Sequence, residues 1–191
     1  MKVLVFADLH EDYECFEVLK EKAKQAEIIL GAGDYTLFGN KLNKLLSMIN
    51  SLNKPCYLIH GNHEEPKEME EEIKKFKNLE FIHKRKIKYK TLEIAGYGGD
   101  GFSHKDLEAE KFFDKSKPKD SIILFHGPPF GISLDEVGFG HCGNESYTNI
   151  ITQHKPRLVV CGHIHEHFGK IDKINDTIII NPGPLGVILD V

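Results

Sequence analysis

Several features are missing from this sequence of 191 residues, and each absence argues against a class of protein. No apolar run approaches the ~20 residues that a membrane-spanning helix needs. Acidic residues follow directly on the first apolar run, where a signal peptide would still be apolar. Positive charge is not in excess either, because 25 basic and 29 acidic residues give a formal net charge of −4. We therefore expect a soluble, cytoplasmic protein with no membrane partner, for which contact with nucleic acid could only be local.

Paired cysteine motifs are also absent. The four cysteines, at positions 15, 56, 142 and 161, form no C-x-x-C pair, so we expect free thiols and no disulfide framework. Linkers rich in proline, glycine and serine are missing, as are repeats of about 20–50 residues. With 40% hydrophobic and 28% charged residues, the composition predicts one globular domain over residues 1–191.

Apolar runs of strand length alternate with helical patterns along the chain. Residues 2–7 predict a strand, a helix follows to about residue 25, and residues 27–60 repeat the unit as strand (27–32), helix (42–52) and strand (55–60). Two strand–helix crossovers of this kind favour a parallel sheet in an α/β protein. The other predicted elements are helices at 64–77, 105–113 and 145–154, and strands at 80–82, 86–88, 91–96, 121–125, 157–161, 168–171 and 177–180.

Side chains that bind metals follow directly on five of the predicted strands. They are Asp8 and His10, then Asp34, then Asn62 with His63 and Glu64, then His126, and finally His163 with His165. The carboxyl ends of parallel strands line one crevice in an open α/β sheet, so residues far apart in sequence can converge there. One such residue alone is commonly a helix cap or a core residue. Five coincidences, several beside a glycine that lets the backbone approach closely, indicate a functional site.

The donor types indicate which metal chemistry is available. Two aspartates, one asparagine and four histidines form a mixed oxygen and nitrogen set without thiolate, which suits Mn, Fe, Ni or Zn better than Ca or Mg. A single tetrahedral zinc needs at most four of these seven donors. The surplus predicts two divalent transition-metal ions about 3.5–4 Å apart that share a carboxylate, an arrangement used to cleave phosphate esters. Manganese is the expected ion, with iron, nickel and zinc as alternatives.

Together these motifs resemble the calcineurin-like metallophosphoesterase family. The residues that carry the resemblance are Asp8-x-His10, Gly33-Asp34, Gly61-Asn62-His63-Glu64, His126 and Gly162-His163-x-His165. The stretches 126–130 (His-Gly-Pro-Pro-Phe) and 181–183 (Asn-Pro-Gly) are most similar to the Icc-related predicted phosphoesterases of archaea and bacteria. The resemblance implies a four-layer α/β/β/α sandwich of two mixed sheets, which accommodates the short strands at 80–96 and 168–180.

The family resemblance also implies a role for each site residue. Asp8, His10, Asp34 and His165 would hold the first metal, and Asp34, Asn62, His126 and His163 the second, with Asp34 as the bridge. A metal-bound hydroxide would attack phosphorus in line. His63 would stabilise the phosphoryl oxygens and help to protonate the leaving alkoxide, with Glu64 as an orienting partner.

The sequence departs from the phosphoprotein phosphatases of this family after Gly33-Asp34. Leu37 stands where those enzymes have the aspartate that pairs with the catalytic histidine, and Phe38 stands where they have a phosphate-binding arginine. A phenyl ring cannot bind a phosphate dianion as a guanidinium does. A small phosphodiester, which carries one charge less, is therefore the expected substrate. A non-catalytic interaction scaffold stays open as an alternative, although such scaffolds typically lack the histidine present here as His63.

Three further segments have weaker signals. The basic strip 84–90 alternates with Ile87 and Tyr89, and we expect a solvated edge strand there; the alternative is a nucleic-acid contact, as in a nuclease. The glycine-rich segment 96–101 matches G-x-G-x-x-G, but a turn near the mouth of the site is favoured over dinucleotide binding. The segment 138–143 precedes a helix, so Gly143 is a candidate for a substrate loop whose amides face an anion.

Overall fold

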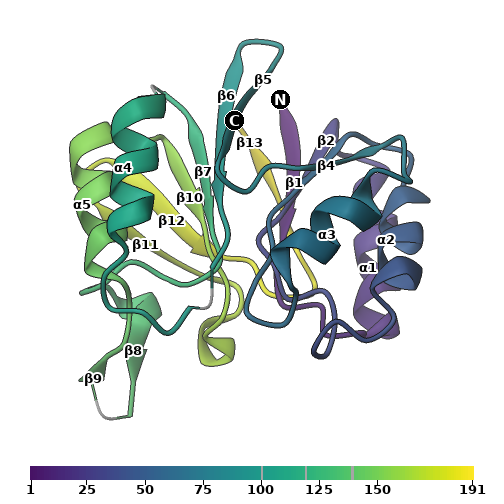
Figure 1. The fold of residues 1–191 in the computed structure, drawn as a ribbon, viewed down its shortest axis with the longest axis horizontal. Helices are drawn as coiled ribbons and strands as arrows, with labels where there is room; N and C mark the ends of the chain where they lie inside the picture. The colour runs from purple at the N-terminus through teal and green to yellow at the C-terminus, as the bar shows by residue number, and fades with distance from the viewer. Residues whose placement is uncertain (100, 119, 139) are drawn as a thin grey trace.

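Two β-sheets lie back to back in the computed structural model, which describes residues 1–99, 101–118, 120–138 and 140–191 (Figure 1). In spatial order the first sheet consists of β13 (Val187–Asp190), β1 (Lys2–Phe6), β2 (Ile28–Gly31), β3 (Cys56–Leu58) and β4 (Leu79–Phe81). The second consists of β11 (Lys170–Ile174), β12 (Thr177–Asn181), β10 (Leu158–Val160), β7 (Ile122–Phe125), β6 (Leu92–Tyr97) and β5 (Arg85–Tyr89). Both sheets are mixed, because β13, β11 and β5 run antiparallel to their neighbours within otherwise parallel sheets.

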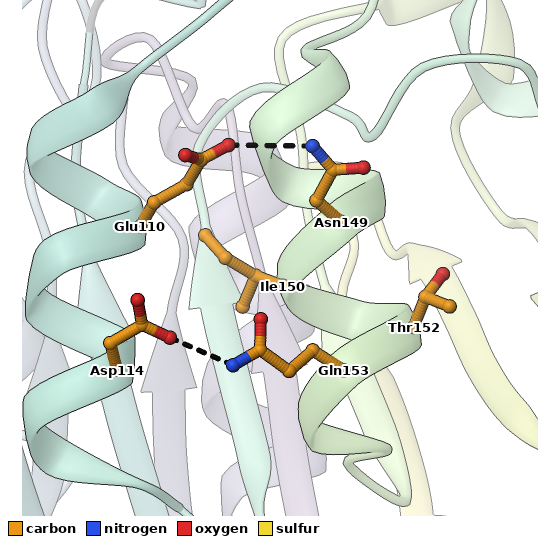
Figure 2. Close-up of a pocket in the computed structure, with 6 residues that line it drawn as sticks. All are labelled: Glu110, Asp114, Asn149, Ile150, Thr152 and Gln153. Carbon is orange, nitrogen blue, oxygen red and sulfur yellow. Dashed lines mark hydrogen bonds between the residues drawn. The ribbon is translucent and has the colours of Figure 1, made fainter.

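Helices cover the outer face of each sheet (Figure 1). The first sheet is covered by α1 (Tyr13–Ala23), α2 (Leu42–Asn50) and α3 (Pro66–Ile73), and the second by α4 (Leu107–Ser116) and α5 (Glu145–His154). The predicted four-layer α/β/β/α sandwich is thereby confirmed. Figure 2 shows how α4 and α5 lie side by side, joined by Asn149 donating to Glu110 and Gln153 donating to Asp114 at 2.8 Å.

The core explains why the strands are apolar throughout. Side chains alternate between the two faces of a strand, and in β1 Val3 and Val5 pack between the sheets while Leu4 and Phe6 pack against the helices. Both faces are buried, so the sequence shows a continuous apolar run instead of an alternating pattern. At the end of such a run the chain turns away from the core, which is where the polar motifs begin.

The carboxyl ends of β1, β2 and β3 in the first sheet and of β7 and β10 in the second point toward the same side of the molecule (Figure 1). Helices begin soon after several of these loops. Asp12 caps α1 by accepting a hydrogen bond from the amide of Cys15 at 2.9 Å, and Asn144 caps α5 by accepting one from Ser146 at 2.9 Å. These caps fix where the loops end, so the segments that follow the strands are well defined.

The largest differences from the sequence-based prediction are a missed strand, a missed hairpin and a shorter helix. The strand β13 was not predicted, and neither was the hairpin of β8 (Glu136–Val137) and β9 (Gly140–His141). The predicted helix 64–77 is shorter and ends at Ile73. The basic strip 84–90 does form an edge strand, as expected, because β5 lies at the end of the second sheet. The four cysteines are free. The single-domain assignment of residues 1–191 stays a prediction.

In the described part of the chain, no helix has both the length and the apolar character needed to cross a membrane. The predicted segments 96–101 and 138–143 each include one residue, Asp100 and Phe139 respectively, that lies outside the described part of the chain.

Candidate metal centre

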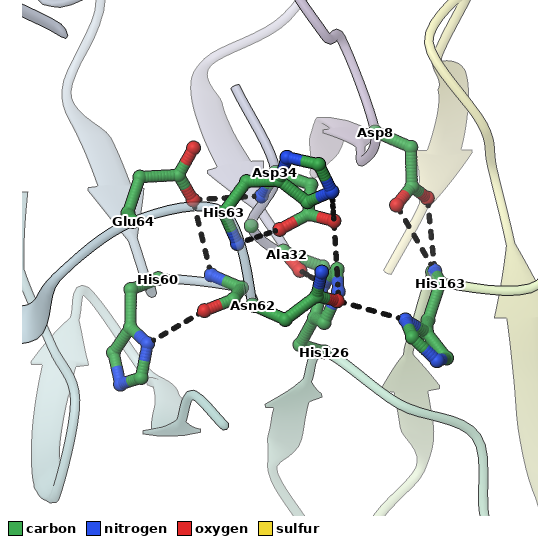
Figure 3. A network of polar contacts seen from close by, with 12 residues as sticks. Asp8, Ala32, Asp34, His60, Asn62, His63, Glu64, His126 and His163 are labelled. Carbon is green, nitrogen blue, oxygen red and sulfur yellow. Dashed lines mark hydrogen bonds and ion pairs between the residues drawn. The ribbon is translucent and has the colours of Figure 1, made fainter. Parts of the chain in front are cut away.

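The seven predicted donors come together between the two sheets, on loops that follow β1, β2, β3, β7 and β10. Figure 3 shows Asp8, Asp34, Asn62, His126 and His163 among them. Their ligand atoms form overlapping clusters, within each of which all ligand atoms lie within 4.8 Å of one another. Those clusters are Asp8 with His10 and His165, His10 with Asp34 and His63, and Asp34 with His126 and His163. The neighbouring amide oxygen Oδ1 of Asn62 lies 3.0 Å from His126 Nε2 and 2.9 Å from His163 Nδ1.

Asp34 lies at the centre of this arrangement. Its Oδ2 is 3.2 Å from His126 Nε2 and 3.8 Å from His10 Nε2, so one carboxylate reaches donors of both outer clusters. Its Oδ1 accepts a hydrogen bond of 2.9 Å from the backbone amide of His63. The side chain is 3% exposed and cannot move away into solvent. A carboxylate held in this way is placed to share its oxygens between two cations.

Several donor-bearing residues adopt the left-handed backbone conformation, which is uncommon for residues other than glycine. The φ angles are 55° at Asp8, 44° at His10, 55° at Asp34 and 71° at His163. Backbone hydrogen bonds between the loops hold this conformation, including Asp8 to the carbonyl of Gly33 and His10 to the carbonyl of Asp34, both 3.0 Å. Strained conformations of this kind persist where the surroundings over-determine them, and they concentrate at functional sites.

Two glycines allow the carboxylates to approach the opposite loops. A Cβ atom on Gly61 would overlap Oδ1 of Asp34, and a Cβ atom on Gly162 would overlap Oδ2 of Asp8. Steric constraints therefore explain why glycine precedes Asn62 and His163 in the sequence motifs. Any larger residue at either position would displace the aspartate that defines one side of the site.

The hydrogen bonds made by two of the histidines leave one ring nitrogen of each facing the site. Nδ1 of His126 donates to the carbonyl of Ala32 at 2.8 Å, and Nδ1 of His10 donates to the carbonyl of Thr36 at 3.2 Å. The Nε2 atoms then face Asp34. Metal-binding histidines are typically fixed by a hydrogen bond from the other ring nitrogen, so this donor set fits divalent transition-metal ions.

Burial makes the charges of the site depend on one another. Burial acts to raise the pKa of Asp34, but the hydrogen bond and positive charge of His126 outweigh it and lower the pKa to about 2. Burial likewise opposes protonation of His126, and yet the contact with Asp34 raises its pKa to about 9. Burial raises the pKa of Asp8 to about 7. In the metal-free protein His126 and Asp34 thus form a buried ion pair, which a metal cation has to replace.

Glu64 has a different partner from the predicted one. It does not orient the ring of His63; instead Oε2 accepts from the amides of Asp34 (2.9 Å, Figure 3) and Gly61 (3.1 Å). Its Oε1 accepts from the amide and hydroxyl of Thr36 (both 2.9 Å). Glu64 is buried. Its carboxylate accepts hydrogen bonds from backbone amides of two loops, and these amides are not paired within a sheet. It therefore ties the loop after β2 to the loop after β3.

Phe38 provides the hydrogen bond that orients His63. Its backbone amide donates to Nδ1 of His63 at 3.2 Å, so Nδ1 has no proton and Nε2 carries it. Nε2 faces the site and lies 3.9 Å from Oδ2 of Asp34. The phenyl ring of Phe38 also covers the imidazole of His63, with ring centroids 4.3 Å apart. No sequence pattern signals this contact, because a backbone amide has no residue signature.

Gly143 does not offer its amide to the metal centre. That amide donates at 3.0 Å to Oδ2 of Asp135, a buried carboxylate that also accepts from Gly131, Ile132 and His141. An internal carboxylate thus already occupies this amide, and the assignment of Gly143 to a substrate loop stays a prediction. Phe102, the residue after the segment 96–101, lines the cavity together with His163.

A family model described as calcineurin-like phosphoesterase matches residues 1–167 of the chain. The chain belongs to the calcineurin-like phosphoesterase family. This confirms the resemblance drawn from the strand-end motifs. Members of the calcineurin-like family hydrolyse phosphoesters and use divalent metal ions, in agreement with the Asp and His clusters described above.

Two relatives and one solved structure illustrate the breadth of this family. An uncharacterized protein of Methanocaldococcus jannaschii is 29% identical over 96% of this chain and 88% of its own length. A probable glycerophosphodiester phosphodiesterase of Arcobacter nitrofigilis is 24% identical over 83% of this chain, and the match spans 64% of that protein. A crystal structure of a Thermus thermophilus protein has a TM-score of 0.78 at 17% identity, and the match covers 96% of this chain and 89% of that one. That likeness supports the fold.

Proposed function

We propose that this phosphoesterase is a binuclear metal-dependent phosphodiesterase. The observation that carries the proposal is the position of Asp34, whose Oδ2 lies within 4 Å of both His126 Nε2 and His10 Nε2. One ion would be held by Asp8, His10, Asp34 and His165, and the other by Asp34, Asn62, His126 and His163. Manganese suits this mixed oxygen and nitrogen set, and iron, nickel and zinc suit it too.

The chemistry divides between the ions and the protein. The ions, when bound, activate water and neutralise the phosphoryl oxygens. His63 contributes a hydrogen-bond donor, because the amide of Phe38 occupies Nδ1 and leaves Nε2–H directed at the site. A neutral imidazole with its proton on Nε2 can donate a hydrogen bond to a phosphoryl oxygen or to the departing alkoxide. Glu64 and the glycines keep the loops in the position that this hydrogen bond requires.

A diester is favoured over a monoester by what lines the cavity. The described lining residues are His10, Asp34, Leu37, Asn62, His63, Phe102, His163 and His165, and neither lysine nor arginine is among them. The second negative charge of a monoester would therefore find no guanidinium or ammonium partner. The curated relative from Arcobacter nitrofigilis bears the name of a phosphodiesterase, which supports the same substrate class. A small phosphodiester is thus the proposed substrate.

Hydrolysis of two chromogenic esters tests this proposal. Protein loaded with Mn²⁺ is expected to hydrolyse bis(p-nitrophenyl) phosphate with a higher kcat/KM than p-nitrophenyl phosphate, and EDTA should abolish both activities. Re-addition of Mn²⁺ after removal of EDTA should restore them. A protein that stays inactive on both esters with Mn²⁺, Fe²⁺, Ni²⁺ and Zn²⁺ would point to the non-catalytic scaffold instead.

A further inference from the structure

Large apolar side chains stand exposed around the metal centre. Phe38 is 83% exposed, Phe102 is 68% exposed and Leu37 is 47% exposed. Isolated exposed apolar residues are common on proteins. Here Leu37 and Phe102 line the same cavity, and Phe38 follows Leu37 directly. We call these three residues the apolar rim.

Both aromatic rings of the apolar rim rest on histidines of the site. Phe38 lies over His63 at a centroid distance of 4.3 Å and an angle of 35° between the ring planes. Phe102 meets His163 at 4.7 Å and 85°, in an edge-to-face contact. The two histidines come from different sheets, His63 after β3 and His163 after β10. The loops of both sheets thus place an exposed aromatic residue against a histidine of the site.

The backbone of Phe38 is held in a conformation that a phenylalanine rarely adopts. Its φ is 54°, a region in which bulky residues are outliers. The amide of Phe38 is fixed on His63, and the amide of Gly39 donates to the hydroxyl of Thr36 at 3.0 Å. The ring is thus presented to solvent by a backbone that is anchored on both sides. A rigid, exposed aromatic face is a stacking surface.

The chemistry of the apolar rim selects among phosphodiesters. None of its three side chains has a polar atom, so hydroxyl groups on a substrate would gain no partner there. A flexible alkyl chain would lose rotamer freedom on binding, whereas a flat ring loses little. A flat aromatic group has an apolar face to place on Phe38 or Phe102. The rim therefore fits an aromatic substituent better than a glycerol or an alkyl chain.

We infer that the substrate is a phosphodiester that carries a planar aromatic group, either an aryl ester or a nucleobase, and that Phe38 and Phe102 bind this group. The inference rests on the proposed phosphodiesterase function, since it assumes that the phosphate lies at the metal centre. It makes Phe38 and Phe102 specificity-determining residues. The chemistry that recognises the substrate is thus stacking outside the metal centre and charge neutralisation within it.

Calorimetric binding of three diesters tests the inference. Mn²⁺-loaded protein is titrated with diphenyl, dibutyl and diethyl phosphate, which share one charge and differ in their substituents. Diphenyl phosphate is expected to bind about 5- to 150-fold more tightly than diethyl phosphate, the range typical of one aromatic stack, and dibutyl phosphate should bind weakly as well. Dibutyl phosphate binding as tightly as diphenyl phosphate, or equal binding of all three, would overturn the inference.

Variants identify the residues responsible. Phe102→Ala and Phe38→Ala should each reduce the affinity for diphenyl phosphate toward that for diethyl phosphate, without changing the latter. Phe130→Ala is the matched control, because Phe130 also contacts a histidine, His141, but does not line the cavity. Unchanged affinities in both rim variants would exclude stacking on these rings.

The methyl ester of adenosine 5′-phosphate separates the two sources of an aromatic group. Tighter binding of this ester than of diphenyl phosphate assigns a nucleobase, and the reverse order assigns an aryl ester. Hydrolysis of bis(p-nitrophenyl) phosphate is followed in the same preparations. If the protein hydrolyses bis(p-nitrophenyl) phosphate but binds diphenyl phosphate no more tightly than diethyl phosphate, only the stacking inference is contradicted. If it prefers diphenyl phosphate but hydrolyses no ester, only the phosphodiesterase function is contradicted.

Discussion

Charged residues occur in two contrasting settings in this molecule, the metal centre between the sheets and the edge strand β5. Asp8 and Asp34 are each 2% exposed, and their partners are backbone amides and histidines from both sheets. The lysines of the basic strip lie at the surface, where Lys84 pairs with Glu108 at 2.6 Å and Lys86 with Glu93 at 3.5 Å. In the sequence, the metal-centre residues and the basic strip both stand out as clusters of polar residues. Only the metal centre lowers the stability of the fold, because its charged groups are removed from water.

This difference indicates where function resides. Buried carboxylates need hydrogen bonds or charged partners, and here both aspartates accept from backbone amides of loops while Asp34 also pairs with His126. Exposed lysine pairs contribute little to stability because water and salt screen them. Changes in the metal centre should therefore have large effects on activity, whereas changes in β5 should have almost none.

Replacement of Asp34 should produce the largest effect. Asp34→Asn keeps the shape of the side chain but removes the charge that both clusters share. We expect activity on bis(p-nitrophenyl) phosphate to fall to background, and metal analysis to show less than two ions per chain. Asp172→Asn is a suitable control, since Asp172 pairs with Ser133 on the far part of the second sheet. Full metal occupancy in Asp34→Asn would contradict the bridging role.

His63→Ala should fail in a different way from Asp34→Asn. The ring of His63 would contact the phosphoryl group and the leaving group and not the ions. The metal content of the variant should therefore stay near that of the wild-type protein, while turnover falls about 10²–10⁴-fold, the usual range for a positioned acid. The loss should be smaller on a p-nitrophenyl ester, whose leaving group barely needs a proton, than on an alkyl ester. An emptied metal site would instead make His63 a ligand, a role that its distance of 3.9 Å from Asp34 makes worth testing.

Glu64→Gln should have an intermediate effect, mainly on stability. The carboxylate accepts hydrogen bonds from the amides of Asp34, Thr36 and Gly61, and an amide side chain would turn a donor toward some of them. We expect the unfolding free energy of the metal-free protein to fall by about 1–3 kcal/mol, the cost of unsatisfied buried donors. Glu65→Gln, one residue further and exposed, should change it by less than about 0.5 kcal/mol. Urea unfolding measures both.

The smallest effect is expected from β5. Replacing Lys84, Lys86, Lys88 and Lys90 by Ser should leave turnover of a small diester unchanged, because the strip lies at the edge of the second sheet. A large loss on a small diester would place the strip in the active site. A salt-sensitive loss confined to oligonucleotides would support the alternative nuclease function.

Much of this architecture could be predicted from the sequence, because buried parallel strands leave continuous apolar runs and the metal donors follow them directly. β1, β2 and β3 were found in this way, and with them Asp8, Asp34 and Asn62. The strand β13 was not predicted, although it is as long as β2, and its partner β1 lies at the other end of the chain. Such long-range pairing leaves no local pattern.

The misassigned partner of His63 has a similar cause. A carboxylate next to a histidine in sequence, as Glu64 is, suggests a pair, but the chain direction turns the two side chains apart. Glu64 satisfies buried amides, and the orienting hydrogen bond comes from the amide of Phe38, which any residue at that position except proline would also supply. Backbone contacts of this kind become visible only in three dimensions.

Calorimetric titration of the metal-free protein with Mn²⁺ tests the central claim most directly. We expect two ions per chain, bound more tightly at pH 8.5 than at pH 6.5, because His126, with its pKa raised to about 9 by Asp34, must lose its proton before it can bind a cation. Binding of the ion that His126 would hold therefore releases a proton, and higher pH favours this release. Saturation at one ion or none, or tighter binding at the lower pH, would contradict a binuclear centre built on Asp34 and His126.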